Sequence, residues 1–312
     1  MGSRPTLRAQ QQPQYTETKR NNVLKGFNHK GCETSVAAMN LTFSECDWHP
    51  RHVIRAIRSV KSSTEVIQVE LDSGNAYLKG MGNPQGDECL AFELVGTRLA
   101  RLAKLFVPDY GVFRHEGLDL IRISGQVVET GPVFVSLALP GLPGGGGQAA
   151  LKRVENRFDI PLLVAFDTWL RNADRCPPAT ALDPRPNWDN IFFVPLSSGK
   201  LHLAVFDHTH CFAEGALDDA LESGAYLDDA AVYGAFPEFM PFLTEDALRG
   251  AVHAICAIDC DSIERVVHEV PVEWGITGGT RSEWLRQIIA RRGSLEEILL
   301  DNLLSQRVME FR

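Results

Sequence analysis

Residues 166–175 read Phe-Asp-Thr-Trp-Leu-Arg-Asn-Ala-Asp-Arg, and residues 206–208 read Phe-Asp-His. The first stretch ends an apolar segment that predicts a helix over 162–170, and its last four residues predict a loop. The second stretch ends an apolar run, 201–206, that we expect to be a strand. Polar side chains placed against apolar runs are costly to desolvate, so both stretches favour a functional role.

A third stretch completes the pattern. Asn190 precedes the apolar run Ile191–Val194, which predicts the partner strand of 201–206. Two carboxylates and an amide in this order fit phosphoryl transfer to a hydroxyl, because one carboxylate takes the hydroxyl proton while the amide oxygen and the second carboxylate hold Mg²⁺. Asn187 competes with Asn190 for the metal-binding role. Taken alone, Asn190 or Asp207 is compatible with an ordinary strand-edge, turn or cap residue.

The region upstream predicts a sheet. Polar and apolar residues alternate over 65–71, residues 72–75 form a turn cluster, and 76–79 predict the returning strand of a hairpin. Further strands are expected at 112–113, 118–123 and 133–139, and the apolar spacing over 88–105 predicts a helix. Residues 53–140 therefore predict a mostly antiparallel sheet with one long helix.

Lys79 and Glu93 are the charged residues of interest in this region. Lys79 lies in the returning strand, and Glu93 lies fourteen residues later, on or beside the apolar face of the helix. A strand lysine paired with a helix glutamate holds nucleotide phosphates in protein-kinase-like folds. The alternative is a lysine at a sheet edge with an incidental ion pair.

Taken together, these residues resemble the HipA-like family of protein-kinase-fold proteins. The resemblance is carried by Lys79, Glu93, Asn172-x-Asp174-Arg175, Asn190 and Asp207-His208, and covers roughly residues 53–212. It implies an α+β, bilobal, protein-kinase-like fold, with a small antiparallel-sheet N-lobe and a larger, mostly helical C-lobe. It also implies an ATP- and Mg²⁺-dependent kinase that acts on a Ser or Thr hydroxyl of a protein.

The resemblance also implies roles for single residues. Asp174 is the expected catalytic base, and Lys79, held by Glu93, is the expected phosphate clamp. Asn190 and Asp207 are the expected metal ligands, and residues 133–139 include the expected adenine-side hinge.

The sequence departs from this pattern in three places. The expected phosphate-covering loop, 60–65, contains no glycine, although Ser62, Ser63 and Thr64 could donate to phosphate. The loop between the expected base and Asn190 is lengthened by residues 176–186. The residues before 46 are too few for the extra N-terminal subdomain of the family's toxins.

The predicted organisation has three parts. Residues 1–45 are a polar arm, 46–143 the N-lobe with the phosphate clamp, and 144–312 the helical C-lobe with the catalytic loop and metal site. The glycine run Gly144–Gly147 is expected to be the hinge between the lobes. Thr280 with Glu283, and Ser294 with Glu297, fit capping boxes that support C-terminal helices.

Composition narrows the class of protein. The chain has 312 residues, 44% of them hydrophobic, and a formal net charge of −9, which argues against nucleic-acid binding through bulk charge. The uncharged run 130–151 is interrupted by prolines and glycines, so no membrane span is expected there. The first 22 residues lack a signal-peptide core, and the seven scattered cysteines fit a reducing, cytoplasmic location.

Several alternatives remain open at this point. The same fold suits a small-molecule or lipid kinase, or a nucleotide-binding interaction module with weakened turnover. A structural protein, in which the polar residues only cap helices and turns, is a further possibility. Zinc at His208, His210 and Cys211 is a weak alternative, and His253, Cys256 and Cys260 are interpreted as small core residues. The acceptor and the oligomeric state are not specified by the sequence.

Overall fold

A computed structural model describes residues 48–143, 147–178, 180–182, 184–213 and 215–304. The described residues all belong to one compact unit, Ala38–Arg312. The predicted arm at 1–45 and residues 144–146 of the predicted hinge lie outside the described residues. The predicted lobe boundaries therefore remain a prediction.

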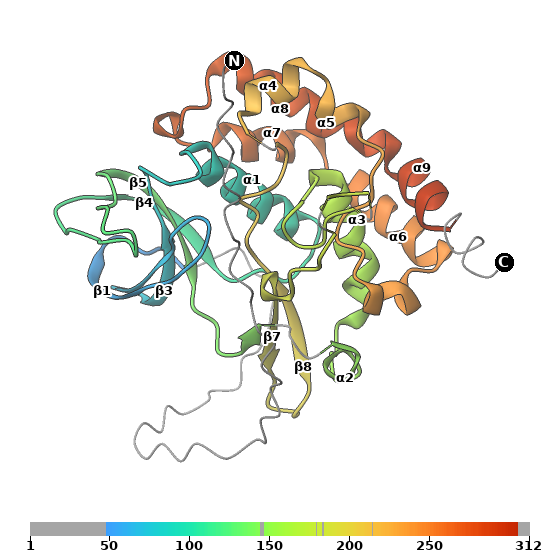
Figure 1. The fold of residues 1–312 in the computed structure, drawn as a ribbon, viewed down its shortest axis with the longest axis horizontal. Coiled ribbons are helices and arrows are strands. Elements are labelled where there is room, and N and C mark those ends of the chain that lie inside the picture. The colour runs from blue at the N-terminus through green and yellow to red at the C-terminus, as the bar shows by residue number, and fades with distance from the viewer. Residues whose placement is uncertain (1–47, 144–146, 179, 183, 214, 305–312) are drawn as a thin grey trace, which may run out of the picture. The chain divides into compact units, whose positions relative to one another are not determined.

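Strands predominate in the first part of the described chain and helices in the second (Figure 1). The strands are β1 (Val53–Ser59), β2 (Ile67–Leu71), β3 (Gly74–Lys79), β4 (Tyr110–His115), β5 (Gly131–Leu137), β6 (Leu142–Pro143), β7 (Ile191–Pro195) and β8 (Leu201–Val205). The α-helices are α1 (Glu88–Leu102), α2 (Gly147–Leu151), α3 (Ile160–Leu170), α4 (Leu217–Glu222), α5 (Ala225–Asp228), α6 (Glu245–Cys256), α7 (Cys260–His268), α8 (Gly278–Arg291) and α9 (Leu295–Leu299). Short helical turns are η1 (Arg157–Asp159), η2 (Trp188–Asn190), η3 (Pro237–Phe242), η4 (Val272–Trp274), η5 (Arg292–Ser294) and η6 (Leu300–Leu304).

The first sheet has five antiparallel strands in the order β1-β2-β3-β5-β4 within the described residues. Strand β2 alternates buried and half-buried residues, as its sequence predicts, and pairs with β3 in the expected hairpin. Gly74 at the turn has a φ of +119°, a conformation that L-residues rarely adopt. The predicted antiparallel sheet is confirmed.

The strand predicted at 118–123 is wrong. The segment forms one isolated bridge, between Ile121 and Val127, and then reverses direction around Gly125, whose φ is +88°. Arg122 turns inward, and its guanidinium donates to the carbonyl oxygens of Gly80 and Met81 at 2.9 and 2.7 Å. These bonds hold the segment as a loop against the strand that contains Lys79.

Helix α1 is buried over most of its circumference, because the five-stranded sheet and the C-terminal helices both cover it (Figure 1). The ring of Phe92 packs 5.8 Å from that of Phe212 and 5.9 Å from that of Trp284, measured between centroids. The predicted helix over 88–105 is confirmed, but it ends three residues early. Lys104 has a φ of +70°, and this left-handed residue turns the chain away from the helix axis.

The second sheet has the strand order β6-β7-β8. The predicted pairing of 191–194 with 201–206 is confirmed, with Ile191 opposite Val205. This register places Asn190, which precedes β7, and Asp207, which follows β8, at the same end of the hairpin.

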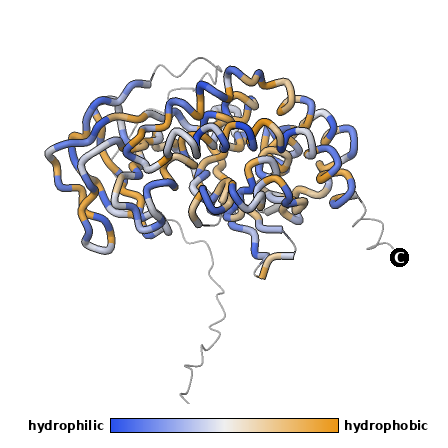
Figure 2. Tube along the Cα trace, turned by 90° about the horizontal axis from the view of Figure 1, so that it is seen from above, coloured by the Kyte–Doolittle hydropathy of each residue, from blue (hydrophilic) through white to orange (hydrophobic). Residues whose placement is uncertain are grey.

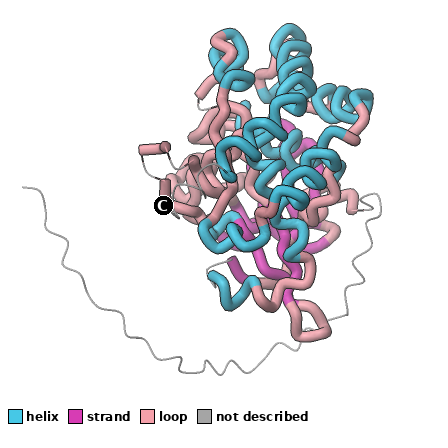
Figure 3. Tube along the Cα trace, turned by 90° about the vertical axis from the view of Figure 1, so that its right-hand side faces the viewer, coloured by secondary structure: helices cyan, strands magenta, loops and turns pink. Residues whose placement is uncertain are grey.

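Helices make up most of the remaining chain (Figure 3), and hydrophobic and hydrophilic residues are interspersed along the trace (Figure 2). The capping boxes predicted at Thr280 and Ser294 are wrong. The N-cap of α8 is Thr277, whose Oγ1 accepts from the amide of Thr280 at 3.2 Å, and Ser294 makes no side-chain cap bond at α9. Thr277 and Thr280 both carry a hydroxyl that can cap the start of α8. Which of them is the N-cap therefore depends on where tertiary packing starts the helix.

The fold is thus α+β, with a small antiparallel-sheet part followed by a larger helical part, as the resemblance implies. None of the helices in the described ranges is both long and apolar enough to cross a bilayer.

We predict that Gly96→Ala destabilises the protein, because a Cβ at Gly96 would lie 2.4 Å from Cβ of the buried His208. Overpacking of this kind costs about 1–3 kcal/mol, which exceeds the ~1 kcal/mol that alanine gains over glycine in a helix. Thermal unfolding measures the effect.

The matched control is Gly250→Ala in α6, where nothing lies within 4 Å of the added carbon. Its unfolding midpoint should rise or stay the same. A Gly96→Ala midpoint equal to or above that of the wild type would contradict the close packing of α1 against His208.

Candidate functional site

Lys79 lies between two carboxylates that come from different parts of the fold. Its Nζ is 2.8 Å from Oε2 of Glu93 on α1 and 2.8 Å from Oδ1 of Asp207, which follows β8. The side chains of Lys79 and Glu93 are 9% and 4% exposed, whereas that of Asp207 is 19% exposed. The predicted Lys79–Glu93 pair is therefore formed, and Asp207 is its most accessible member.

The backbone around Asp207 brings it to this position. Asp207 has a φ of +61°, so the chain turns sharply directly after β8. The next residue, His208, donates its amide hydrogen to Oε2 of Glu93 at 2.9 Å, and its Nδ1 lies 3.2 Å from Oγ1 of Thr97. Gly96 leaves room for this contact. Sequence reasoning missed Gly96 and Thr97, although their spacing of three and four residues from Glu93 places all three on one helix face.

The charges of the three groups stabilise one another. Burial alone would lower the pKa of the Lys79 ammonium, but attraction to Asp207 and Glu93 outweighs burial and raises this pKa above its usual value. Burial would raise the pKa of Asp207, but Lys79 and the Thr209 hydroxyl, which donates to Oδ1 at 2.7 Å, hold it far below its usual range. Asp207 is therefore ionised at neutral pH.

Asp174 and Asn190 form a second group. Nδ2 of Asn190 donates to Oδ2 of Asp174 at 2.7 Å, and Asn190 is buried while Asp174 is half-buried. Asn187, the competing amide, instead caps η2, since its Oδ1 accepts from the amide of Asp189 at 3.2 Å.

Arg175 connects the two groups. Its Nε donates to the carbonyl oxygen of Asn190 at 3.3 Å, and its Nη2 donates to the carbonyl oxygen of Phe206 at 2.8 Å. Its Nη1 forms an ion pair with Oδ1 of Asp167, and both side chains are fully buried. Sequence reasoning assigned no role to Asp167, whose signal was a carboxylate in an otherwise apolar helix.

The expected phosphate-covering loop follows β1. Ser63 lies nearest the site, with its Oγ 3.2 Å from Nε2 of His210, three residues after Asp207. Ser62 Oγ instead accepts from the amide of Val66 at 3.2 Å, and Thr64 is buried. The structure thus brings Ser63 close to the Asp207 segment, while Ser62 bonds within the loop and Thr64 is buried.

The donor set fits Mg²⁺. Both described contacts of the Asp207 carboxylate use Oδ1, which leaves Oδ2 for a cation, and Asn190 donates through its nitrogen, which leaves its amide oxygen. Within the described ranges, no three His, Cys, Asp or Glu side chains are grouped so that they could hold a metal ion. Mg²⁺ does not need such a group, because it is often held by one or two protein oxygens together with substrate phosphates.

The remaining candidates have other roles. His208 is fully buried, and this burial lowers its pKa well below its usual value. The interpretation of His253, Cys256 and Cys260 as core residues is wrong. All three are exposed: His253 and Cys256 lie outside the buried face of α6, and Cys260 is the first residue of α7. The predicted hinge at 133–139 coincides largely with β5, and its contact with adenine remains a prediction.

Comparison with known proteins identifies a structural relative. No family model and no curated protein matches the sequence. Among solved structures, the chain is similar to the crystal structure of a Helicobacter pylori proinflammatory kinase, CtkA, with a TM-score of 0.53 and 12% sequence identity. The match covers 82% of this chain and 98% of that chain. This likeness shows a kinase-like fold, and membership of the HipA-like family remains a prediction.

We predict that Asp207→Asn lowers the free energy of unfolding by about 1–3 kcal/mol at pH 7, because Lys79 loses a charged hydrogen-bond acceptor. The folded-state pKa of Asp207 is depressed, so its carboxylate stabilises the fold fully above its unfolded pKa of about 3.9. This contribution is lost as the pH falls further. Urea unfolding of both proteins between pH 8 and pH 3.5 measures the difference.

The difference should stay constant from pH 8 to about pH 5 and shrink below pH 4. Asp246→Asn, which changes an exposed carboxylate on α6, is the control and should change stability little at any pH. A difference for Asp207→Asn that persists undiminished at pH 3.5 would rule out the depressed pKa.

Proposed function

We propose that this protein is an ATP- and Mg²⁺-dependent phosphotransferase, similar to the HipA-like serine/threonine kinases, that transfers the γ-phosphoryl group to a hydroxyl. The observation that carries the proposal is the placement of the Lys79 ammonium between Glu93 and Asp207, 2.8 Å from each. A protein with a kinase-like fold needs this lysine in place to orient the phosphates of ATP.

Lys79 acts as the phosphate clamp. Glu93 holds its ammonium at the end of β3, so that the charge is already oriented when nucleotide binds, and little is lost in ordering the side chain. Ser63, in the loop after β1, is assigned as a donor to phosphate, because its Oγ lies 3.2 Å from Nε2 of His210 in the Asp207 segment. Ser62 supports the loop by accepting from the amide of Val66. The segment after Asp207 contacts Ser63 through His210 and forms the opposite side of the proposed phosphate site.

Asp174 acts as the catalytic base. Asn190 donates to its Oδ2, which fixes the carboxylate and leaves Oδ1 to accept the proton of the acceptor hydroxyl. Because Asp174 is half-buried, it is accessible to an acceptor from outside.

Asn190 and Asp207 are the proposed metal ligands. Bound Mg²⁺ supplies charge neutralisation to the phosphates during transfer. Asn190 and Asp207 lie at one end of the β7–β8 hairpin, where their side-chain oxygens would face the same cation. Asn190 is favoured over Asn187, because Asn187 Oδ1 is already used to cap η2.

We further propose a protein hydroxyl as the acceptor and the cytoplasm as the location. The acceptor follows from the resemblance. The location is supported by the free cysteines, of which five lie in the described part of the chain. A small-molecule or lipid acceptor on the same fold is the alternative.

The test is incubation with γ-labelled ATP and Mg²⁺, alone and with cell lysate. We predict label transfer by the wild type, and a loss in kcat on the order of 10²–10⁴-fold for Asp174→Ala, because general-base catalysis contributes this much. The control is Asp246→Ala, which removes an exposed carboxylate from α6 and should keep wild-type kcat.

The destination of the label distinguishes the alternatives. Label on a protein supports the proposal, and label on a metabolite or lipid changes the acceptor class. ATP binding without transfer or hydrolysis indicates the nucleotide-binding module instead. Wild-type kcat in Asp174→Ala would exclude Asp174 as the base.

A further inference from the structure

One buried arginine links the stretches of chain that carry Asp174, Asn190 and Asp207. Arg175 directly follows Asp174 and is 0% exposed. Its guanidinium pairs with Asp167 on α3 and donates to the carbonyl oxygens of Asn190 and Phe206. Phe206 directly precedes Asp207, so the two carbonyl contacts fix the backbone at, or one residue away from, a proposed site residue.

The guanidinium suits this task because it is planar and its donors are fixed relative to one another. One rigid group that binds two carbonyl oxygens sets the distance between them. The Asn190 and Asp207 backbones are therefore held in a fixed relation to each other and to Asp174.

The backbone of residues 233–235 packs against the Arg175–Asp167 ion pair. A Cβ at Gly234 would lie 2.4 Å from Oδ2 of Asp167, so the missing side chain lets the 233–235 backbone cover the carboxylate. The amide of Gly234 also donates to the carbonyl oxygen of Cys176 at 2.9 Å, which ties the same segment to the residue after Arg175.

A gain in the stability of the fold does not by itself explain the buried Arg175–Asp167 ion pair. Desolvation of two charges offsets much of their attraction, and a buried ion pair is often replaced by apolar residues without loss of stability. The carbonyl contacts of Arg175, in contrast, are made only with the residues that bracket the proposed site.

We infer that Arg175 is a positioning residue that sets the relative placement of Asp174, Asn190 and Asp207 for phosphoryl transfer. The inference rests on the proposed function and deepens it. Displacement of reacting groups by about 1 Å can reduce turnover on the order of 100-fold, so the loss of this link should appear in kcat.

The test separates positioning from stability. Arg175→Met should lower both the thermal midpoint and kcat, since it leaves the Asp167 carboxyl buried without its ion-pair partner. The double variant Arg175→Met/Asp167→Leu removes both charges, and should recover most of the lost midpoint. Its kcat should remain on the order of 100-fold below wild type.

Arg175→Lys is the second variant, for the case in which the methionine variants do not fold. Lysine keeps a charge beside Asp167 but lacks the fork that reaches both carbonyl oxygens. Its kcat should fall on the order of 10- to 100-fold at a near-wild-type midpoint.

Arg281→Lys is the matched control. Arg281 is also buried, and it donates to the carbonyl oxygens of Val267, His268 and Val270, none of which belongs to a stretch that carries the proposed site. Its loss should lower the midpoint while kcat per folded molecule stays at the wild-type value.

Recovery of kcat together with the midpoint in the double variant, or wild-type kcat in Arg175→Lys, overturns the inference.

A wild type that binds ATP without transferring it overturns the proposed function instead. The inference is then decided by the affinity for a non-hydrolysable ATP analogue: Mg²⁺ should strengthen binding in the wild type and not in Arg175→Lys. An equal Mg²⁺ effect in both overturns it, as does the absence of binding.

Discussion

The interaction on which the site depends is the contact of the Lys79 ammonium with two carboxylates, one on α1 and one after β8. A buried ammonium is stable only where opposite charges surround it, so Lys79 requires both Glu93 and Asp207. In meeting this requirement, the chain brings the five-stranded sheet, α1 and the β7–β8 hairpin together. The same requirement places an ionised Asp207 carboxylate at the partly exposed end of the group, where a metal and phosphates are proposed to bind.

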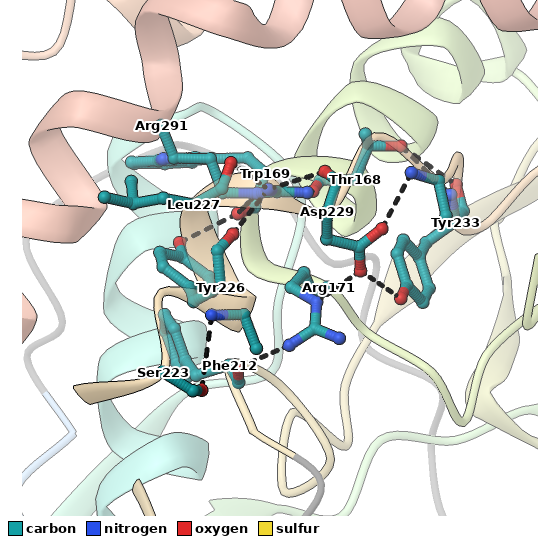
Figure 4. A network of polar contacts seen from close by, with 12 residues as sticks. Thr168, Trp169, Arg171, Phe212, Ser223, Tyr226, Leu227, Asp229, Tyr233 and Arg291 are labelled. Atoms are coloured by element: carbon teal, nitrogen blue, oxygen red, sulfur yellow. Dashed lines mark hydrogen bonds and ion pairs between the residues drawn. The ribbon is translucent and has the colours of Figure 1, made fainter. Parts of the chain in front are cut away.

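The helical part supports the other half of the site through the end of α3. Arg171, the left-handed residue that ends α3, donates through Nε to Oδ2 of Asp229 at 2.5 Å, and the Tyr233 hydroxyl donates to the same oxygen at 2.6 Å (Figure 4). Arg291 donates to the buried carbonyl oxygens of Thr168 and Trp169 in the last helical turn. The loop that contains Asp174 thus begins from a helix end whose backbone groups are fully engaged.

The sequence predicted the elements whose pattern is local. The alternation in β2, the turn at Gly74 and the apolar spacing of α1 each depend on near neighbours, and each was predicted correctly apart from the end of α1. The pairing of Lys79 with Glu93 also followed from a strand and a helix close in sequence. The segment 118–123 failed because its apolar residues indicate a strand, whereas Arg122 turns it into a loop through carbonyl contacts with Gly80 and Met81.

The parts that sequence could not supply depend on contacts between distant residues. No local pattern distinguishes Thr277 from Thr280 as the cap of α8, or indicates that Arg175 binds the carbonyl oxygens of Asn190 and Phe206. The choice between Asn187 and Asn190 likewise rests on a capping bond that only coordinates reveal. The exposure of His253 and Cys256 depends on which face of α6 packs against the rest of the fold.

The most direct test of the central claim is a crystal structure of the protein with a non-hydrolysable ATP analogue and Mg²⁺. The account predicts the triphosphate beside Nζ of Lys79, with the metal held by side-chain oxygens of Asp207 and Asn190 and the carboxylate of Asp174 facing the γ-phosphate. Nucleotide bound elsewhere, or a metal held by Asn187 in place of Asn190 with Asp207 uninvolved, would contradict it.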